Sequence, residues 1–566
     1  MPPPRKRERL SGGTLIGVIT LVDAVSSCWF GYCQGVFAGV LVSEDFQRMF
    51  PQTNDASISG IVTSCFLVRI YTPLRRGQEP IVSNRNQRSQ LGAFFGAIAA
   101  FILGDKLGRK RTIALGHSLN LVGAVLQFTS WHLPQLIVGR VVNGVGMGMT
   151  STISPVYLAE CARSHLRGRL LVVGASSNVS CFCLANWISY GMYFHDHGAG
   201  NQRWWWRRGF FPENSETDEN EEGRYQQQQE EDPLVVAEYR SIKTAIRLER
   251  ESRVPLIDVL CHRDQTQNFR RLLLACGTQF MQQFSGINAL GEFDVVPWKP
   301  IECGFYFPTL LHENVGFDEQ MSRLLTAVSG TIYLVAAFCS LFVIDRIGRR
   351  KLMLNGAVGM AVCHLIAAIC LKAGEDDPSK TKTKVLVLTP RPCGQMGNVT
   401  VAMFVLYHVF FSPTWGGVPW VYSAEINSLG WRSRGAAAAT GTNWLMAFVV
   451  VQFTKAGVDN LRWAFYLIFA AFCICFAPIV FCFYPETSNR TLEDMDQIFI
   501  RNPSVLVCGN DEMTQRARPQ ALVDAETERI SAAAAGGTSG GGGGGEDSNS
   551  GSGPTTVVAV KAGPLK

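Results

Sequence analysis

The chain has 566 residues, of which 47% are hydrophobic and 17% are charged, with a formal net charge of +6. The charges are gathered between long apolar blocks, which excludes an ordinary soluble domain and indicates a protein embedded in a lipid bilayer. Basic clusters flank the apolar blocks instead of lining a groove, which argues against a nucleic-acid partner.

The predicted membrane helices follow one another along most of the chain. A bilayer core needs about 20 consecutive, mostly apolar residues per helix. The segments that meet this need are residues 15–41, 113–131, 133–158, 170–194, 324–344, 352–371, 399–424, 435–453 and 463–484. Because these segments hardly alternate polar and apolar faces, we predict an all-α membrane protein.

One sequence motif, the repeated phrase, occurs twice, as GDKLGRKRT at 104–112 and as IDRIGRRKL at 344–352. Basic residues beside a span favour the cytoplasmic side, so both copies should lie there. A second pair recurs at equal spacing, since Glu160 precedes Arg167 and Glu425 precedes Arg432 by seven residues. Buried charges need partners of opposite charge. We therefore predict a network of ion pairs that closes the transport pathway at the inner face in one state and separates in another. The alternative is that these charges only orient the helices in the membrane. The predicted network comprises Asp105, Arg109, Glu160, Arg167, Asp345, Arg349, Glu425 and Arg432.

Further motifs occur in a fixed order along the chain. They are FGYCQGV at 30–36, GRVVNGVGMG at 139–148, SPVYLAE at 154–160, QQFSGINA at 282–289, WGGVPWVYSAE at 415–425 and PETSNRTLEDMDQIF at 485–499. Together with the repeated phrase, this set resembles the sugar-porter branch of the major facilitator superfamily, and in particular its fungal members. The resemblance implies a major facilitator fold of two six-helix bundles. It also implies transport of a hexose, pentose or polyol across the plasma membrane by alternating access.

Amide side chains are the strongest candidates for contacts with such a solute. Gln282, Gln283 and Asn288 interrupt an apolar run, and amides both donate and accept hydrogen bonds, which suits hydroxyl-rich ligands. Contacts between helices are the alternative role for some of them. The resemblance implies that these three residues hold sugar hydroxyls. It implies the same role for Trp420, Asn443 and Trp444.

A cysteine occupies a position that bears on energy coupling. Proton-coupled members of the resembling family carry an aspartate where this chain has Cys33, close to the arginine matched by Arg140. A buried thiol stays neutral, so we expect facilitated transport; proton-coupled symport is the alternative. Gly174 also stands about where many relatives carry a polar sugar ligand, which leaves the identity of the sugar open.

The second and seventh helices are interrupted in the sequence, and a sixth helix is not evident. Residues 57–68 and 92–104 join into one span, but the insert 69–91 between them is rich in arginine. An arginine at a helix centre costs roughly 2.5–3.5 kcal/mol. Residues 291–303 break the seventh span, and residues 201–211 lead directly into an acidic linker. The open explanations are an inverted half, a re-entrant segment or a mistaken gene translation. We favour a mistaken gene translation because each insert divides a span that is otherwise continuous.

The predicted organisation has five parts. A cytoplasmic N-terminus (1–14) precedes an N-terminal transmembrane bundle (15–200), a cytoplasmic linker (201–269), a C-terminal bundle (270–484) and a cytoplasmic tail (485–566) that is disordered from about 510. A non-transporting sugar sensor and an inactive product of a mis-spliced gene remain alternatives to a carrier. No metal-ligand spacing or nucleophile with a nearby base is evident, so we predict neither an enzyme nor a cofactor. The expected partners are a sugar or polyol, the lipid bilayer and, for symport, protons.

Overall fold

The computed structural model describes residues 12–42, 90–162, 164–196, 255–261, 264–290, 296–297, 303–304, 319–375 and 393–516. Most of the predicted insert 69–91, the segment 201–211 where a sixth helix is missing and most of the insert 291–303 lie outside these ranges. So does the chain beyond residue 516.

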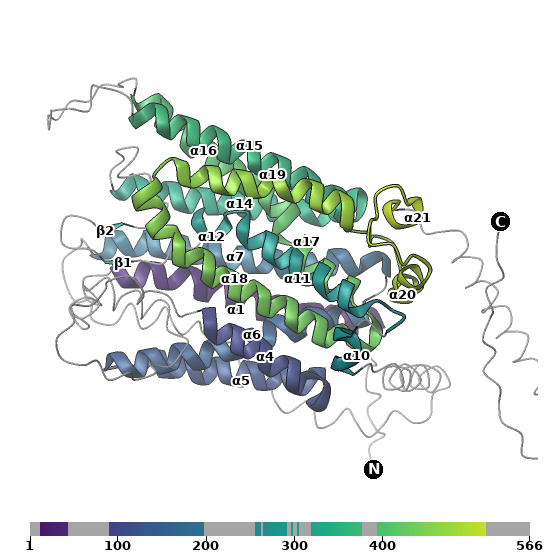
Figure 1. The fold of residues 1–566 in the computed structure, drawn as a ribbon. Helices are drawn as coiled ribbons and strands as arrows, with labels where there is room; N and C mark the ends of the chain where they lie inside the picture. Colours follow the sequence, from purple (N-terminus) through teal and green to yellow (C-terminus); the bar gives the residue numbers. More distant parts are fainter. Residues whose placement is uncertain are drawn as a thin grey trace, which may run out of the picture. The chain divides into compact units, whose positions relative to one another are not determined.

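The described chain is almost entirely helical (Figure 1). The N-terminal half contains α1 (Gly12–Val42), α4 (Gln90–Leu107), α5 (Arg109–Phe128), α6 (Leu133–Cys161) and α7 (Ser164–Asp196). The C-terminal half contains α10 (Leu256–Leu260), α11 (Asn268–Phe284), α12 (Ile287–Leu290), α14 (Glu319–Ile347), α15 (Arg349–Glu375), α16 (Cys393–Phe411), the π-helical turn η5 (Ser412–Gly416), α17 (Val418–Ile426), the 3₁₀ turn η6 (Leu429–Trp431), α18 (Arg432–Leu461) and α19 (Ala464–Phe483). The short helices α20 (Leu492–Arg501) and α21 (Asp511–Thr514) follow, and β1 (Val296–Pro297) pairs antiparallel with β2 (Cys303–Gly304).

Within the described ranges, seven helices are long and apolar enough to cross a membrane. Their apolar stretches are Ile16–Gly35, Pro134–Cys161, Leu166–Ile188, Leu324–Ile347, Arg349–Ala373, Val399–Ile426 and Ala464–Phe483, and each overlaps a segment predicted from the sequence. The predicted segments 113–131 and 435–453 are also helical, as α5 and α18, although they are less apolar. The prediction of an all-α membrane protein is therefore confirmed.

Among the described helices, the two halves meet mainly along two pairs. Within the N-terminal half α1 packs on α7, and α6 packs on both α4 and α5. Within the C-terminal half α15 packs on α16 and α19, and α11 packs on α18. Between the halves α14 lies against α7 and α18 lies against α4. Any cavity enclosed by these four helices therefore has walls from both halves.

The repeated phrase forms the same turn in both halves. One glycine separates α4 from α5 and another separates α14 from α15, at Gly108 (φ 80°) and Gly348 (φ 94°). Only glycine adopts such positive φ values readily, which explains why the phrase keeps it. The arginine that follows each glycine begins the next helix, so the repeat sets Arg109 and Arg349 in matching positions.

The segment after α19 folds back onto the C-terminal half. Helix α20 starts with a capping box, in which the Thr491 hydroxyl accepts from the Asp494 N–H and the Asp494 carboxylate accepts from the Thr491 N–H. Arg271 of α11 forms an ion pair with Asp496 and lies 4.3 Å from the centre of the Phe499 ring. These contacts fix α20 against the start of α11.

Helix α21 extends this attachment. The Glu486 N–H donates to the Met513 carbonyl at 2.9 Å, and the Met513 side chain is fully buried. Arg490 donates to the carbonyls of Glu512 and Gln515 at 2.6 and 2.7 Å. Burial lowers the pKa of the Arg490 guanidinium, and nearby carboxylates, Glu486 first, oppose that shift. The described chain is thus packed up to its last residues.

Candidate transport cavity and charged network

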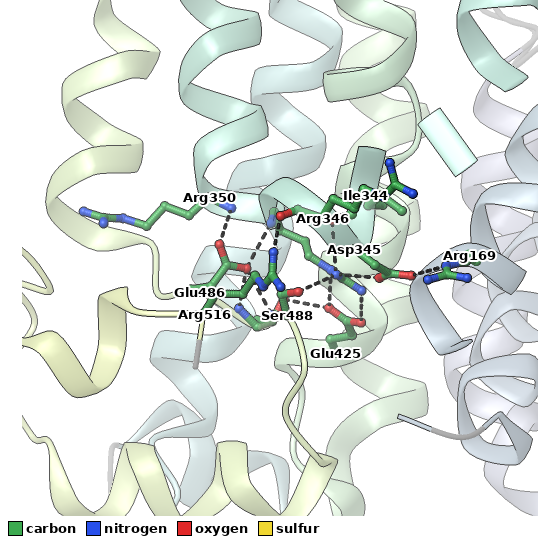
Figure 2. A network of polar contacts seen from close by, with 11 residues as sticks. Arg169, Ile344, Asp345, Arg346, Arg350, Glu425, Glu486, Ser488 and Arg516 are labelled. Atoms are coloured by element: carbon green, nitrogen blue, oxygen red, sulfur yellow. Dashed lines mark hydrogen bonds and ion pairs between the residues drawn. The ribbon is translucent and has the colours of Figure 1, made fainter. Parts of the chain in front are cut away.

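A buried arginine binds both Asp345 and Glu425, two acidic residues of the C-terminal half that Figure 2 labels. Arg349 Nε and Nη2 donate to the two carboxylate oxygens of Glu425 at 3.2 and 2.9 Å. Its Nη1 donates to Asp345 Oδ1 at 2.9 Å and to Ser488 Oγ at 3.0 Å. A guanidinium fork can serve several acceptors at once, so one side chain joins α14, α15, α17 and the segment after α19.

A carboxylate from the segment after α19 caps the start of α15. Glu486 Oε1 accepts from the Arg349 N–H at 2.9 Å and Oε2 accepts from the Arg350 N–H at 3.1 Å. The first N–H groups of a helix have no partner within it, and negative charge is favoured there. Glu486, which the sequence analysis did not select, therefore holds the helix that carries Arg349.

The N-terminal half repeats the arginine–glutamate pair. Arg109 Nε and Nη2 donate to Glu160 Oε2 and Oε1 at 3.3 and 3.1 Å, as Arg349 does to Glu425. Arg167 donates from Nε to the carbonyl of Ala159 at 2.9 Å. The side chain of Asp105 lies outside the described part of the chain.

An ion pair between described residues links the two halves at this end. Arg169 of α7 donates from Nε to Asp345 Oδ2 of α14 at 3.2 Å (Figure 2). Since Asp345 also binds Arg349, this pair ties α7 of the N-terminal half to the network of the C-terminal half. Arg169 was missed in the sequence, although it ends the RGR motif at 167–169.

Arg432 has a different environment from the one its spacing suggested. It is buried at the start of α18, and its Nε and Nη2 have no hydrogen-bond partner among the described residues. Glu425, the acid seven residues before it, binds Arg349 instead. The pairing between acid and arginine in each half therefore runs between helices and not along the seven-residue spacing.

The predicted amide ligands form a hydrogen-bonded cluster between α11 and α18. Asn443 Nδ2 donates to Oε1 of Gln282 and of Gln279, both at 2.8 Å. Gln282 Nε2 in turn donates to the carbonyls of Trp415 and Gly416 at 2.7 and 3.2 Å. These carbonyls belong to the π-helical turn η5, where regular helical bonding changes. The amides thus tie α11 to both α18 and the turn before α17.

A break between α11 and α12 brings the two remaining predicted amides, Gln283 and Asn288, together. Helix α11 ends at Phe284, and α12 starts at Ile287 after Gly286 with φ 97°. Across this break Asn288 Nδ2 donates to Gln283 Oε1 at 2.5 Å. Side chains five residues apart do not share a face of an unbroken helix, and the break is what makes their contact possible.

Loss of the shared amide at position 443 is expected to destabilise the protein. Asn443→Ala leaves the carbonyl oxygens of Gln279 and Gln282 without this donor in a buried site. We expect the free energy of unfolding to fall by about 1–3 kcal/mol, measured by denaturant unfolding of the purified full-length chain. Thr454→Val is the control, because the Thr454 hydroxyl donates only within its own helix, to the Val450 carbonyl. Equal stability of Asn443→Ala and wild type would show that the cluster is not cohesive.

A cavity with a volume of about 100 Å³ lies between the two halves. Its walls come from α1, α6 and α7 on one side and from α14, η5 and α17 on the other. Hydroxyl groups dominate its polar surface, from Ser26, Ser27, Thr150, Ser151, Ser154, Ser176, Tyr333, Ser340 and Ser412. These hydroxyl groups donate and accept hydrogen bonds and carry no charge themselves, which fits a neutral, hydroxyl-rich molecule.

The predicted tryptophans lie at different depths beside this cavity. Trp420 of α17 lines it together with Phe30 of α1. Trp444 is buried in a core cluster and packs edge-to-face on Phe30, with ring centroids 5.1 Å apart. Gly416, whose carbonyl binds Gln282, also lines the cavity. The amide cluster is therefore one residue removed from the cavity wall.

Cys33 and Arg140 lie near one another in the N-terminal half. Asn143 Nδ2 is 3.8 Å from Cys33 Sγ, and Asn143 Oδ1 accepts from Trp29 Nε1 at 3.3 Å.

Among the residues that the structure describes, no three His, Cys, Asp or Glu side chains are grouped as metal ligands.

Comparisons with known proteins agree with this architecture. The family model described as "Sugar (and other) transporter" matches residues 19–499. The chain belongs to this transporter family. The MFS-type transporter oryC of Aspergillus oryzae is 34% identical to it over 550 residues, which cover 93% of each protein. Sugar transporter STL1 of Saccharomyces cerevisiae is 28% identical, over 87% of this chain and 82% of its own.

A solved structure confirms the fold of this family member. The proton:xylose symporter XylE aligns with it at a TM-score of 0.62 and 20% identity, over 86% of this chain and 100% of the other. The predicted major facilitator fold is therefore confirmed. The relatives are transporters and not enzymes, in agreement with the prediction from the sequence.

Proposed function

We propose that the chain carries a neutral polyhydroxy solute, a sugar or a polyol, across the plasma membrane by alternating access. The cavity carries this proposal, because it is rich in hydroxyl groups and its walls belong to both halves of the protein. A rocking motion of the halves would open such a cavity to one side of the membrane at a time. Relatives named as sugar transporters support the same class of solute.

The charged network fits the role of a gate in this proposal. The Arg169–Asp345 pair joins the halves at the end where both copies of the repeated phrase lie. That end is predicted to be cytoplasmic from its basic residues. Closure of this end, with the cavity beyond it, corresponds to a carrier that is shut toward the cytoplasm. Trp420 and the amides around Gln282 are proposed to contact the solute as the cavity changes shape.

Uptake into yeast cells that lack their own sugar carriers tests the proposal. We expect the full-length chain to take up at least one of D-glucose, D-xylose, glycerol and sorbitol, with saturation as the concentration rises. Trp420→Ala removes a ring from the cavity wall and is expected to raise KM for that solute. Uptake no greater than in cells with an empty vector, despite normal amounts of protein at the cell surface, would reject the proposal.

Coupling to an ion gradient is a separate question from the solute. The neutral thiol at Cys33 predicts facilitated transport, because it provides no carboxylate that takes up a proton. A different acidic residue in the cavity favours the alternative, proton-coupled symport.

A further inference from the structure

Asp23 is the single charged residue in the described lining of the cavity. It lies on α1, within an apolar stretch long enough to cross the membrane, and its exposed fraction is 3%. The sequence analysis did not select it. Acidic residues inside membrane helices are costly and usually face a cavity or a partner. The question is therefore what balances the charge of Asp23.

The contacts of Asp23 leave one of its carboxylate oxygens without a described partner. Oδ1 has no hydrogen-bond partner among the described residues. The hydroxyl of Ser154, on α6, lies within hydrogen-bond reach of the carboxyl group. A single hydroxyl does not compensate a buried negative charge.

The neighbouring helix leaves room for this carboxyl group. A β-carbon at Gly174 of α7 would overlap Asp23 Oδ2, and it would stand 3.2 Å from Asp23 Cγ and 3.3 Å from Ser27 Oγ. The absence of a side chain at position 174 is therefore what admits the carboxyl group of Asp23. The polar group at this part of the wall comes from α1 instead of α7.

No described cation contacts Asp23, although ionisable groups face α1 from each neighbouring helix. His117 of α5 bonds to Ser26 Oγ at 2.9 Å, one turn from Asp23. Arg140 of α6 lies by Cys33, ten residues along α1 from Asp23, or about 15 Å at 1.5 Å per residue. The remaining groups are Cys181 of α7, which contacts Cys28, and Tyr333 of α14 across the cavity. None of these supplies a positive charge to Asp23.

We infer that Asp23 is the proton-binding site of this carrier, an inference that rests on the proposed transport function. An ionised carboxylate without a cation is stable when the cavity is open to water and costly when the cavity closes around it. Closure therefore requires that a proton move from water to the Asp23 carboxylate. Opening to the other side returns that proton to water. One proton crosses the membrane in each such cycle, and no other bond is made or broken.

A proton site at Asp23 replaces the expectation of facilitated transport that was based on Cys33. The chain lacks a carboxylate at position 33 but carries one about three turns earlier on the same helix, in the cavity that the solute is proposed to occupy. A solute and a proton that are both needed for closure move together. The carrier is then a symporter despite Cys33.

Infrared difference spectroscopy tests the proton site without any solute. The full-length chain, reconstituted in lipid, is titrated with acid and base while the C=O stretch of protonated carboxyl groups is followed. We expect a titrating band that Asp23→Asn removes and that Asp511→Asn keeps, because Asp511 is exposed on α21. Gly174→Ala, which displaces the carboxyl group, is expected to shift the band. A band that survives unchanged in Asp23→Asn, or an Asp23 that stays ionised throughout and so binds a cation instead, would overturn the inference.

Accumulation of solute in liposomes tests the coupling. For whichever of D-glucose, D-xylose, glycerol and sorbitol the wild type moves, an alkaline interior by one pH unit is expected to drive accumulation up to about tenfold, equivalent to about 1.36 kcal/mol. Asp23→Asn is expected to equilibrate the solute without accumulating it, and Asp23→Glu to restore accumulation. Accumulation by Asp23→Asn equal to that of wild type would overturn the inference. Failure of the wild type to move any of the four solutes would reject the proposed function, while the infrared band would still decide whether Asp23 binds a proton.

Discussion

Arg349→Ala is expected to lower the free energy of unfolding by about 3–5 kcal/mol, the largest loss of stability among single changes in the charged network. The substitution leaves Glu425 and Asp345 without their shared arginine, and Glu425 is 4% exposed. Removing one partner of a buried pair leaves an uncompensated charge, which costs more than the pair contributed. Denaturant unfolding of the purified full-length chain measures the loss.

Lys351→Ala is the matched control for this prediction. Lys351 lies two residues further along the same helix and is exposed, so its loss is expected to stay within about 0.5 kcal/mol. Arg349→Lys keeps the charge but loses the fork that reaches Glu425 and Asp345 together, and it should fall between the two. If Arg349→Ala were as stable as Lys351→Ala, the network would not support the fold.

Gly168→Leu is expected to slow uptake by about fivefold or more by keeping the two halves apart at the gated end. A β-carbon at Gly168 of α7 would overlap Arg349 Nη2 and Asp345 Oδ1 of the other half. Overpacking of this kind costs about 1–3 kcal/mol, and here only the closed state bears the cost. A difference of that size shifts an equilibrium by about 5–150-fold. Initial rates of uptake, corrected for the amount of protein at the membrane, measure the effect.

Gly191→Leu provides the control on the same helix. A β-carbon at Gly191 meets nothing within 4 Å, so the same substitution there adds bulk without separating the halves. Both changes replace a helical glycine and raise helix propensity equally, which leaves the contact at Gly168 as the difference. Equal rates in the two variants would remove the gate from the proposed mechanism.

The repeated phrase predicted part of the charged network correctly from the sequence. It gave the matching positions of Arg109 and Arg349, because one glycine with positive φ and one arginine recur in both copies. It did not give the partners, since Glu425 binds Arg349 from a helix 76 residues away instead of the arginine nearest in sequence. Choice among buried partners depends on how helices pack, and local spacing does not contain that information.

Two omissions from the sequence analysis have different causes. Asp23 carried a readable signal, a carboxylate in the middle of an apolar span, which alone marks a functional candidate. Arg169 carried no such signal, because a basic residue at the end of a span is common and its partner Asp345 lies in the other half. The amide cluster was predicted as a set of residues, but the contact between Gln283 and Asn288 depends on the break at Gly286.

The folding back of the last described residues limits where the carrier can be cut or extended. Arg516 Nη1 donates to the carbonyl of Arg346, directly beside the turn that sets Arg349, and Glu486 caps the helix that follows. A fluorescent reporter joined ahead of Arg516 would displace α21 from its seat against the transporter. Trimming back to the end of α19 would remove the cap itself. Labels for imaging or purification therefore belong beyond Arg516, where they leave these attachments intact.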